Sequence, residues 1–255
     1  MDYRDQGAGV PVIFIHAFPL NQTMWDDQLA VLQSRCRTIT LDLRGFGQSD
    51  APQGSYLMDQ MAADVRGLMS ALGIDRAVLV GLSMGGYVSL AFYRNYPESV
   101  RALVLADTRA SADTHEARKR RLKSAERAER EGARVIAEDM IPLLLGRTTL
   151  DSRPSVVERV RTMIEANSAR GIAGAQRGMA KRRDSTYILP GLDSPVLVIV
   201  GSEDTLTPVA EEESLLNGIR GARLCVIAGA GHLSNMEQPE EFNSALLDFI
   251  ELRTT

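Results

Sequence analysis

The residue types needed for nucleophilic catalysis occur in the chain in the order Ser83, Asp204 and His232. A serine hydroxyl is a weak nucleophile at neutral pH, so it needs a base within hydrogen-bonding reach and a third group that orients the base. Ser83 lies in a Gly-x-Ser-x-Gly segment, residues 81–85, directly after a run of apolar residues. This pattern predicts a buried strand that turns sharply into a helix, which would expose the hydroxyl and aim backbone N–H groups at one point.

His232 is the expected base among the three histidines of the chain. It lies in the segment Gly229-Ala230-Gly231-His232, directly after a predicted strand, whereas His16 ends the first apolar run and His115 lies in a charged region. Parallel strands deliver their carboxyl ends to one edge of a sheet, so Ser83 and His232 can meet there although they are far apart in sequence.

Asp204 is the expected orienting acid. It ends the segment Gly201-Ser202-Glu203-Asp204, which follows the strand before the one that leads to His232. The chain order Ser, Asp, His also matches that of the strand–serine–helix motif. Asp107, at the end of the strand after the serine-bearing helix, is an alternative acid at the same edge, and Glu203 adjoins Asp204.

The elements that position these residues alternate along the chain. We expect strands at 10–18, 37–43, 77–80, 100–106, 195–201 and 223–228, and helices at 23–32, 57–72, 84–96, 208–216 and 239–252. Such an alternation is typical of an α/β fold, a mostly parallel sheet with helices on both faces. The segment 108–187 interrupts it with three or four predicted helices, broken near Gly132, Gly146-Arg147, Pro154 and Gly171. We therefore expect a core domain of residues 1–107 and 188–255 with a helical cap of residues 108–187.

Composition narrows the possible partners. A chain of 255 residues that is 44% hydrophobic can bury one sizeable core, and a net charge of −4 gives no general attraction for nucleic acid. The segment 108–187 is locally basic, with 18 Lys and Arg against 11 Asp and Glu. Its cluster Arg118-Lys119-Arg120-Arg121 is interpreted as a solvated helix face that could guide anionic substrates.

Cys36 and Cys225 lack metal-ligand or redox spacing, so both are expected to be buried, reduced thiols. We see neither a signal peptide nor a membrane-length apolar run, which predicts a cytoplasmic protein without a membrane partner. The sequence says nothing of oligomeric state.

Four motifs together resemble those of the α/β-hydrolase fold superfamily, in its esterase, enol-lactonase and cofactor-free haloperoxidase or perhydrolase branch. They are Gly-Leu-Ser83-Met-Gly-Gly, Asp42-Leu-Arg44-Gly-Phe-Gly-Gln-Ser49, Gly-Ser-Glu-Asp204 and Gly-His232-Leu-Ser-Asn-Met-Glu237. The resemblance covers nearly the whole chain and implies an α/β-hydrolase fold with a helical cap inserted after the strand that follows the nucleophile helix.

The same resemblance implies an oxyanion hole made by the backbone N–H groups of Phe18 and Met84. Relatives usually carry His-Gly where this chain has His16-Ala17, and alanine could restrict the loop if a positive φ were required there. His16, Asp42, Arg44 and Glu237 are expected to be structural. The chain begins at a segment similar to the end of the second strand in relatives, so we expect the usual first hairpin strand to be missing from an eight-stranded sheet.

The expected function is that of a serine hydrolase acting on a small carboxylic ester or lactone through an acyl-enzyme on Ser83, with catalytic residues Ser83, Asp204 and His232. The alternatives are a carbon–carbon bond hydrolase, a perhydrolase, and a non-catalytic ligand-binding protein of the same fold. We expect no cofactor, no bound metal and no nucleic-acid partner.

Overall fold

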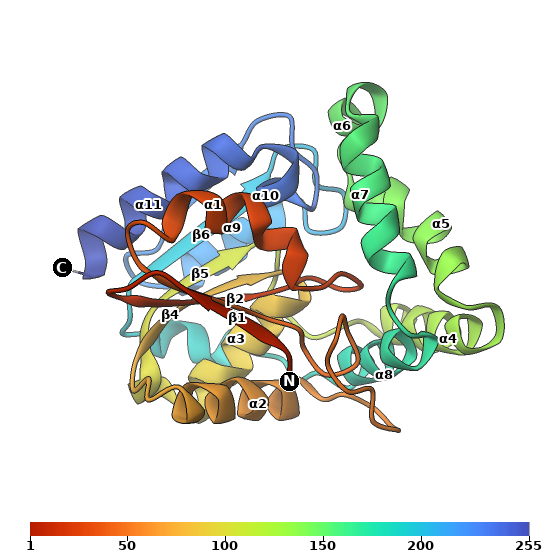
Figure 1. The fold of residues 1–255 in the computed structure, drawn as a ribbon, viewed down its shortest axis with the longest axis horizontal. Helices are drawn as coiled ribbons and strands as arrows, with labels where there is room; N and C mark the ends of the chain where they lie inside the picture. Colours follow the sequence, from red (N-terminus) through yellow and green to blue (C-terminus); the bar gives the residue numbers. More distant parts are fainter. Residues whose placement is uncertain (255) are drawn as a thin grey trace.

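A seven-stranded, mostly parallel sheet forms the centre of the computed structural model, which describes residues 1–254 (Figure 1). Its strand order is β1-β3-β2-β4-β5-β6-β7, and only β1 is antiparallel to its neighbour. The strands are β1 (Tyr3–Gln6), β2 (Pro11–Ile15), β3 (Arg37–Leu41), β4 (Ala77–Leu82), β5 (Val100–Ala106), β6 (Val196–Gly201) and β7 (Arg223–Ile227). The predicted α/β-hydrolase fold class is confirmed, and the sheet of the described residues has seven strands, as expected for one without the first hairpin strand.

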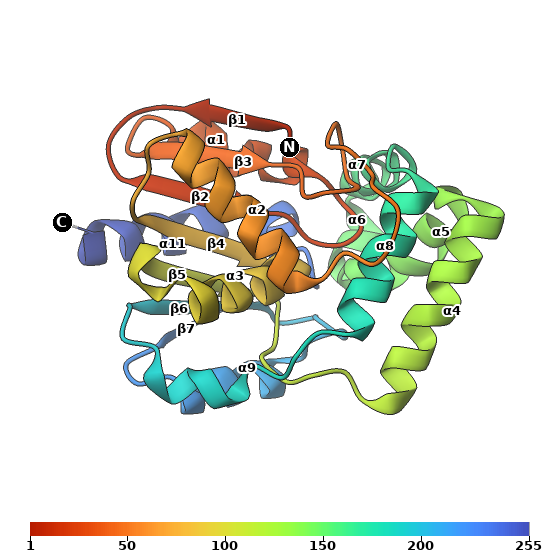
Figure 2. The same cartoon turned by 90° about the horizontal axis from the view of Figure 1, so that it is seen from below.

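Helices cover both faces of the sheet, as Figure 2 shows. The short helix η1 (Gln22–Trp25), α1 (Asp26–Leu32), α10 (Ser234–Glu237) and α11 (Pro239–Thr254) lie on one face, whereas α2 (Met58–Ala71), α3 (Met84–Asn95) and α9 (Val209–Gly218) lie on the other. Every residue of β4 and β6 is buried, because both strands are central in a sheet that is covered twice. Two apolar clusters result, one against each face.

Five α-helices lie between β5 and β6, where three or four helices were predicted. They are α4 (His115–Glu131), α5 (Ala133–Leu144), α6 (Arg147–Ser152), α7 (Pro154–Glu165) and α8 (Ala169–Ala180). The breaks predicted near Gly132, Gly146 and Pro154 are present. The break predicted near Gly171 lies a few residues earlier, between Glu165 and Ala169, and Gly171 itself is in the first turn of α8, where Ser168 caps its backbone N–H. Glycine allows close packing there, since a Cβ on Gly171 would lie 1.8 Å from the Gly45 carbonyl oxygen.

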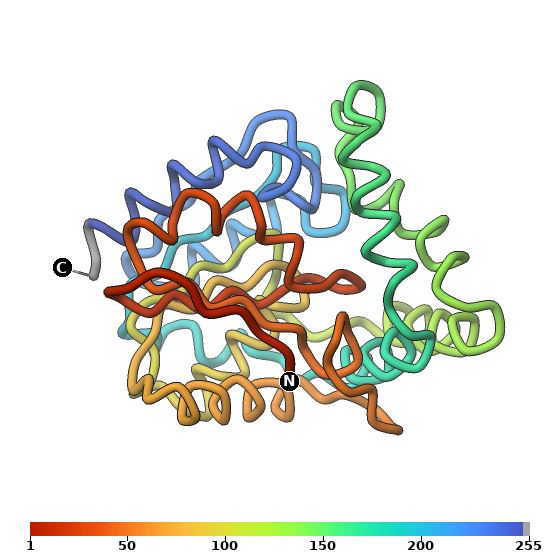
Figure 3. The backbone as a smooth tube through the Cα atoms, viewed as in Figure 1, coloured from red at the N-terminus to blue at the C-terminus, as the bar shows by residue number. Residues whose placement is uncertain are grey.

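The five helices α4–α8 lie beside one end of the sheet, and α11 extends toward the opposite end (Figure 3). The carboxyl ends of the parallel strands lie at the end of the sheet beside α4–α8. Two further 3-10 helices connect elements of the core: η2 (Pro97–Ser99) precedes β5, and η3 (Thr186–Gly191) leads from α8 into β6. The chain therefore leaves the sheet after β5, builds the helical segment over one edge, and returns to the sheet at β6.

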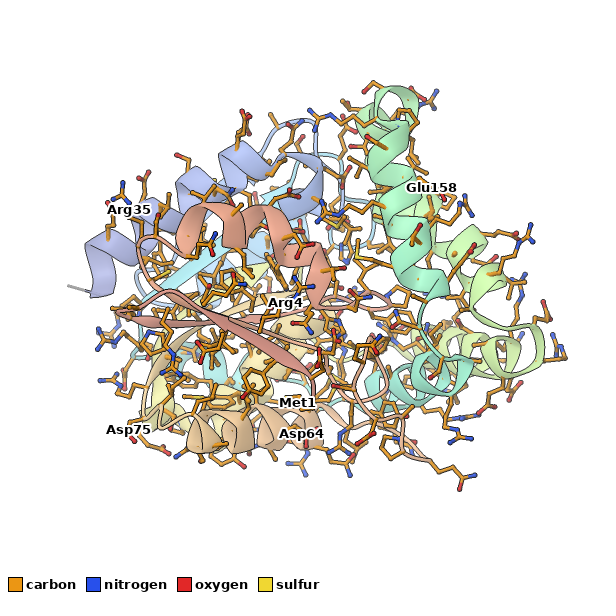
Figure 4. The ribbon with its side chains drawn as sticks, viewed as in Figure 1. Met1, Arg4, Arg35, Asp64, Asp75 and Glu158 are labelled. Carbon is orange, nitrogen blue, oxygen red and sulfur yellow. The ribbon has the colours of Figure 1, made fainter. Side chains whose placement is uncertain are left out.

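Charged side chains project from the outer surface of the sheet and helices, as Figure 4 shows for Arg35, Asp75 and Glu158. Arg4 of β1 forms an ion pair of 2.7 Å with Asp26 at the start of α1. None of the helices within residues 1–254 is both long and apolar enough to cross a membrane.

Both cysteines carry free thiols. Cys36 is buried as predicted, and burial raises the pKa of its thiol to about 11. Cys225 is only partly buried, which corrects the expectation for this residue, because β7 is the edge strand of the sheet.

Candidate active site

Ser83 occupies the junction between β4 and α3 with φ of 54° and ψ of −111°, a backbone conformation that a residue with a side chain seldom adopts. The flanking glycines make this turn possible. A Cβ on Gly81 would lie 2.4 Å from the Gly85 carbonyl oxygen, and a Cβ on Gly85 would lie 2.1 Å from the Ile15 carbonyl oxygen. The Gly-x-Ser-x-Gly pattern therefore places the serine on a sharp turn at the carboxyl edge of the sheet.

A continuous chain of hydrogen bonds joins the three predicted polar residues. The Ser83 Oγ lies 2.7 Å from His232 Nε2, and His232 Nδ1 lies 2.7 Å from Asp204 Oδ2. His232 and Asp204 are 3% and 6% exposed, so bulk water competes little for these contacts. The imidazole is oriented by a carboxylate on one side and can accept the serine proton on the other.

The surroundings of Asp204 favour its charged form. Its Oδ1 accepts hydrogen bonds from the backbone N–H groups of Leu206 and Thr207, and its Oδ2 accepts one from the Thr207 hydroxyl at 2.6 Å. Burial raises the pKa of Asp204, but the charge of His232 and the hydrogen bonds from His232 and Thr207 outweigh it and hold the pKa below its ordinary value. An ionised Asp204 can stabilise a positive charge on His232.

The two other carboxylates considered at this edge do not contact the imidazole. Asp107 accepts hydrogen bonds from the backbone N–H of Gly201 and from the Ser234 hydroxyl. Its burial, together with the charge of Asp204, raises its pKa well above the ordinary value, which favours a neutral carboxyl group. Glu203 points the other way and accepts hydrogen bonds from the backbone and the hydroxyl of Thr148 in α6.

The backbone N–H groups of Phe18 and Met84 lie on the two segments that flank the serine. Met84 is the first residue of α3, so its N–H has no partner within the helix. Phe18 follows His16-Ala17 and lines the same cavity as Ser83. Ala17 does not have a positive φ, so the alanine that replaces the usual glycine fits this loop without backbone strain.

Three residues expected to be structural hold the surrounding loops. The Nε2 of His16 accepts a hydrogen bond from the Leu43 backbone N–H at 3.0 Å. Asp42 accepts from the backbone N–H groups of Gln22 and Gln48. Glu237 accepts from Gly231 and Leu233 on either side of His232, and also from Gly146 in the helical segment.

Arg44 joins its turn to α2 through an ion pair with Asp64. His115, the remaining histidine, is exposed at the start of α4 and does not line the cavity beside Ser83.

A cavity of about 270 Å³ opens at Ser83 and is lined from both the sheet edge and the helices α4, α5 and α8. Tyr87 is largely buried and also lines this cavity. Arg109 and Thr207 were not singled out from the sequence, although both follow strands that end at this edge. The remaining lining residues are Phe18, Asp113, Ala117, Arg120, Arg121, Ser124, Met140, Leu143, Leu144, Gln176, Met179, Leu206 and His232.

The basic cluster of α4 has two different environments. Arg118 and Lys119 are exposed, as predicted, but Arg121 is partly buried and forms an ion pair of 2.5 Å with Asp113. Arg120 is exposed and reaches the cavity wall. Within residues 1–254, no group of three or more His, Cys, Asp and Glu side chains is arranged to hold a metal ion.

Residues 10–239 match the family model described as the alpha/beta hydrolase fold. The chain belongs to this family. It is 32% identical over 235 residues to 3-oxoadipate enol-lactonase 2 of Acinetobacter baylyi, an alignment that covers 92% of this chain and 86% of that protein.

Solved structures of family members agree with this assignment. A thermophilic esterase from Thermogutta terrifontis, solved with malate bound, superposes with a TM-score of 0.98 at 44% identity, covering all of this chain and 94% of that one. The enol-lactonase from Burkholderia xenovorans LB400 superposes with a TM-score of 0.92 at 29% identity, covering 98% and 96% of the two chains. This member of the family is therefore similar to hydrolases that include esterases and enol-lactonases.

Proposed function

We propose that this hydrolase cleaves small carboxylic esters or lactones through an acyl-enzyme on Ser83. The observation that carries the proposal is the hydrogen-bonded chain from Ser83 Oγ through the His232 imidazole to the Asp204 carboxylate, with both heavy-atom distances at 2.7 Å. The similarity to an esterase and to enol-lactonases supports ester and lactone carbonyls as the reacting groups.

In the proposed reaction His232 Nε2 takes the hydroxyl proton as Ser83 Oγ forms a bond to the carbonyl carbon. Asp204 stabilises the resulting imidazolium, and the backbone N–H groups of Met84 and Phe18 hold the negative charge that develops on the carbonyl oxygen. One such donor is worth about 3 kcal/mol in the transition state. His232 then gives its proton to the leaving alkoxide as the acyl–oxygen bond breaks.

Release of the acid repeats the same steps with water. His232 Nε2 takes a proton from a water molecule as the water oxygen attacks the acyl-enzyme, and the proton passes to Ser83 Oγ when the acyl bond breaks. Helices α4–α8 act in this proposal as a cap, because residues of α4, α5 and α8 complete the wall of the cavity at Ser83.

The test is hydrolysis of a panel of p-nitrophenyl esters and simple lactones by the wild-type protein and by Ser83→Ala. The variant is expected to keep its fold, measured by circular dichroism, and to lose turnover of every substrate. Undiminished hydrolysis by folded Ser83→Ala would overturn the proposal. Which substrate gives the highest kcat/KM then separates an esterase from a lactonase.

Labelling with a fluorophosphonate distinguishes a hydrolase from a binding protein that retains a reactive serine. The proposal predicts one label per chain, on Ser83, with turnover lost in proportion to labelling. If Ser83 is labelled but the unlabelled protein hydrolyses none of the esters or lactones, the result favours a ligand-binding protein instead of a hydrolase.

A further inference from the structure

The cavity at Ser83 has an unequal charge distribution along its wall. Three arginines, Arg109, Arg120 and Arg121, line it, whereas Asp113 is the one carboxylate among its described lining residues. Most of the remaining wall is apolar, including Met140, Leu143 and Leu144. A ligand that fills this cavity would meet positive charge on an otherwise apolar surface.

The negative charge of Asp113 is already balanced within the protein. Its Oδ2 pairs with Arg121 Nε at 2.5 Å, and its Oδ1 pairs with Arg182 Nη2 at 2.8 Å. The side chains of Asp113 and Arg182 are 1% and 3% exposed. Two guanidinium groups thus share one carboxylate, and neither Arg109 nor Arg120 gains a partner from it.

Arg109 has no ion pair, unlike Arg121, the other partly buried arginine of the cavity wall. No described carboxylate lies within 4.0 Å of its guanidinium, and its buried Nε has no hydrogen-bond partner among residues 1–254. Arg94 and Arg182 also have an unpartnered Nε, but their terminal nitrogens pair with Asp59 and Asp113. Leaving a partly buried charge without an ion pair is costly, so an anionic ligand group at Arg109 would balance a charge that no described carboxylate within 4.0 Å balances.

The position of Arg109 relative to the nucleophile is set by the rigid sheet edge. Arg109 follows Thr108, whose hydroxyl donates to the Ser83 carbonyl oxygen at 2.8 Å and whose N–H donates to Glu212. Tyr87, one helical turn after Ser83 on α3, lies beside the Arg109 guanidinium. Arg109 therefore faces the cavity from the same framework that holds the reacting serine.

We propose that the substrate carries a free carboxylate, which Arg109 binds with help from Arg120, while its ester or lactone carbonyl lies at Ser83. A guanidinium group matches a carboxylate in charge and in bidentate geometry. The apolar wall suits a short aliphatic spacer between the two ends, so the substrate class is the half-ester of a short dicarboxylic acid or a lactone with a carboxylate side chain. This inference rests on the proposed hydrolase function.

The test compares two methyl esters of similar shape, monomethyl glutarate and methyl 4-carbamoylbutanoate, which differ in a carboxylate against a neutral amide. The wild-type protein is expected to show the higher kcat/KM for the carboxylate. Arg109→Gln is expected to lower the ratio of the two kcat/KM values between about 10- and 100-fold, and Arg120→Gln to lower it less because Arg120 is solvent-exposed. The matched control is Arg118→Gln, because Arg118 lies on α4 with Arg120 but outside the cavity. This variant should leave the ratio unchanged.

Each outcome decides for or against the inference. A wild-type preference for the amide, or an equal loss of both activities in Arg109→Gln, contradicts it. If Arg109→Gln does not fold, inhibition of methyl 4-carbamoylbutanoate hydrolysis by glutarate decides: competitive inhibition that Arg120→Gln weakens supports the site, and glutarate acting no better than glutaramide overturns it.

Failure of the proposed function would be recognised separately. In that case neither ester is hydrolysed, or folded Ser83→Ala hydrolyses both. Calorimetric titration of glutarate into the wild-type protein and Arg109→Gln still tests the carboxylate site, since binding does not require turnover. Binding by the wild-type protein that the variant loses supports the site, and equal or absent binding in both contradicts it.

Discussion

Replacing Ser83 by glycine is expected to stabilise the protein relative to replacing it by alanine. Both variants lose the hydroxyl and its hydrogen bond to His232, so the difference between them isolates the Cβ atom. With φ of 54° and ψ of −111°, Ser83 adopts a conformation that costs a residue with a Cβ about 1 to 3 kcal/mol. Glycine avoids this cost but makes the unfolded chain more flexible, a loss of about 0.4 to 1 kcal/mol.

The balance predicts that the free energy of unfolding of Ser83→Gly exceeds that of Ser83→Ala by about 1 kcal/mol. Urea-induced unfolding of the two variants, followed by tryptophan fluorescence and circular dichroism, measures this difference. Trp25 is buried and reports on the core of the molecule.

Ser89 provides the matched control because it lies in the same helix, is buried, and does not have a positive φ. There Ser89→Gly should be less stable than Ser89→Ala, by about 1 kcal/mol, because glycine is the poorer helix former. If Ser83→Gly is no more stable than Ser83→Ala, while the Ser89 pair behaves as expected, the argument from backbone strain is wrong.

Three further variants test the site and the fold. Asp204→Asn should lower kcat/KM for p-nitrophenyl butyrate by about 10³- to 10⁴-fold, because the imidazole loses its ionised partner. Asp107→Asn should lower it less than tenfold. Equal losses in the two variants would contradict the assignment of Asp204 as the orienting acid. Burial raises the pKa of Glu212 well above its ordinary value, so the protein takes up a proton on folding above pH 4.5 and its stability falls as pH rises. Glu212→Gln should therefore become more stable relative to the wild type between pH 5 and 8, by at most about 1.4 kcal/mol per pH unit, and a difference in unfolding free energy that does not vary with pH would contradict this. Gly85→Ala should destabilise the protein by about 3 kcal/mol, because the added Cβ would lie 2.1 Å from the Ile15 carbonyl oxygen. Gly67 in α2 has open space around it, so Gly67→Ala should stabilise the protein by about 0.5 to 1 kcal/mol. Thermal unfolding measures both changes.

The strands and helices of the core could be predicted because their burial follows from local pattern. A strand covered on both faces has an uninterrupted apolar sequence, and β5 lies at residues 100–106, as expected. Strand β2 was expected at 10–18 but ends at Ile15, because the following residues form the loop that carries His16 and Phe18. Apolar character continues through that loop, so hydrophobicity alone could not locate the end of the strand.

Among the proposed catalytic residues, the acid was harder to choose from the sequence than the serine or the histidine. Asp107 and Asp204 both follow parallel strands that end at the same edge, so sequence position alone leaves both near His232. The structure separates them by the direction of the side chain. Asp107, with φ of 45°, turns toward Gly201 and Ser234, whereas Asp204 lies in a loop whose N–H groups and Thr207 hydroxyl orient it toward the imidazole.

The cavity wall could not be derived because it depends on which way each side chain points. Tyr87 has the burial of a core residue and yet lines the cavity, and the ion pair between Asp113 and Arg121 is invisible in a helix read as a solvated face. One signal was available for Arg109. It lies three residues beyond β5, at the edge where the residues after β4 and β6 supply Ser83 and Asp204.

The proposed catalytic residues and most of the residues proposed to select the substrate come from different parts of the molecule. Ser83, Asp204 and His232 all follow strands of one sheet, so their mutual distances depend mainly on the core. Met140, Leu143 and Arg120 come from the helical segment and line the cavity, but none of them bonds to Ser83, His232 or Asp204. Arg109 belongs to the sheet edge, through Thr108 and Ser83, and yet faces the ligand space. A carboxylate bound there would have its distance from the nucleophile set by the core, so exchanging the helices should change which spacer fits while the requirement for the charge persists.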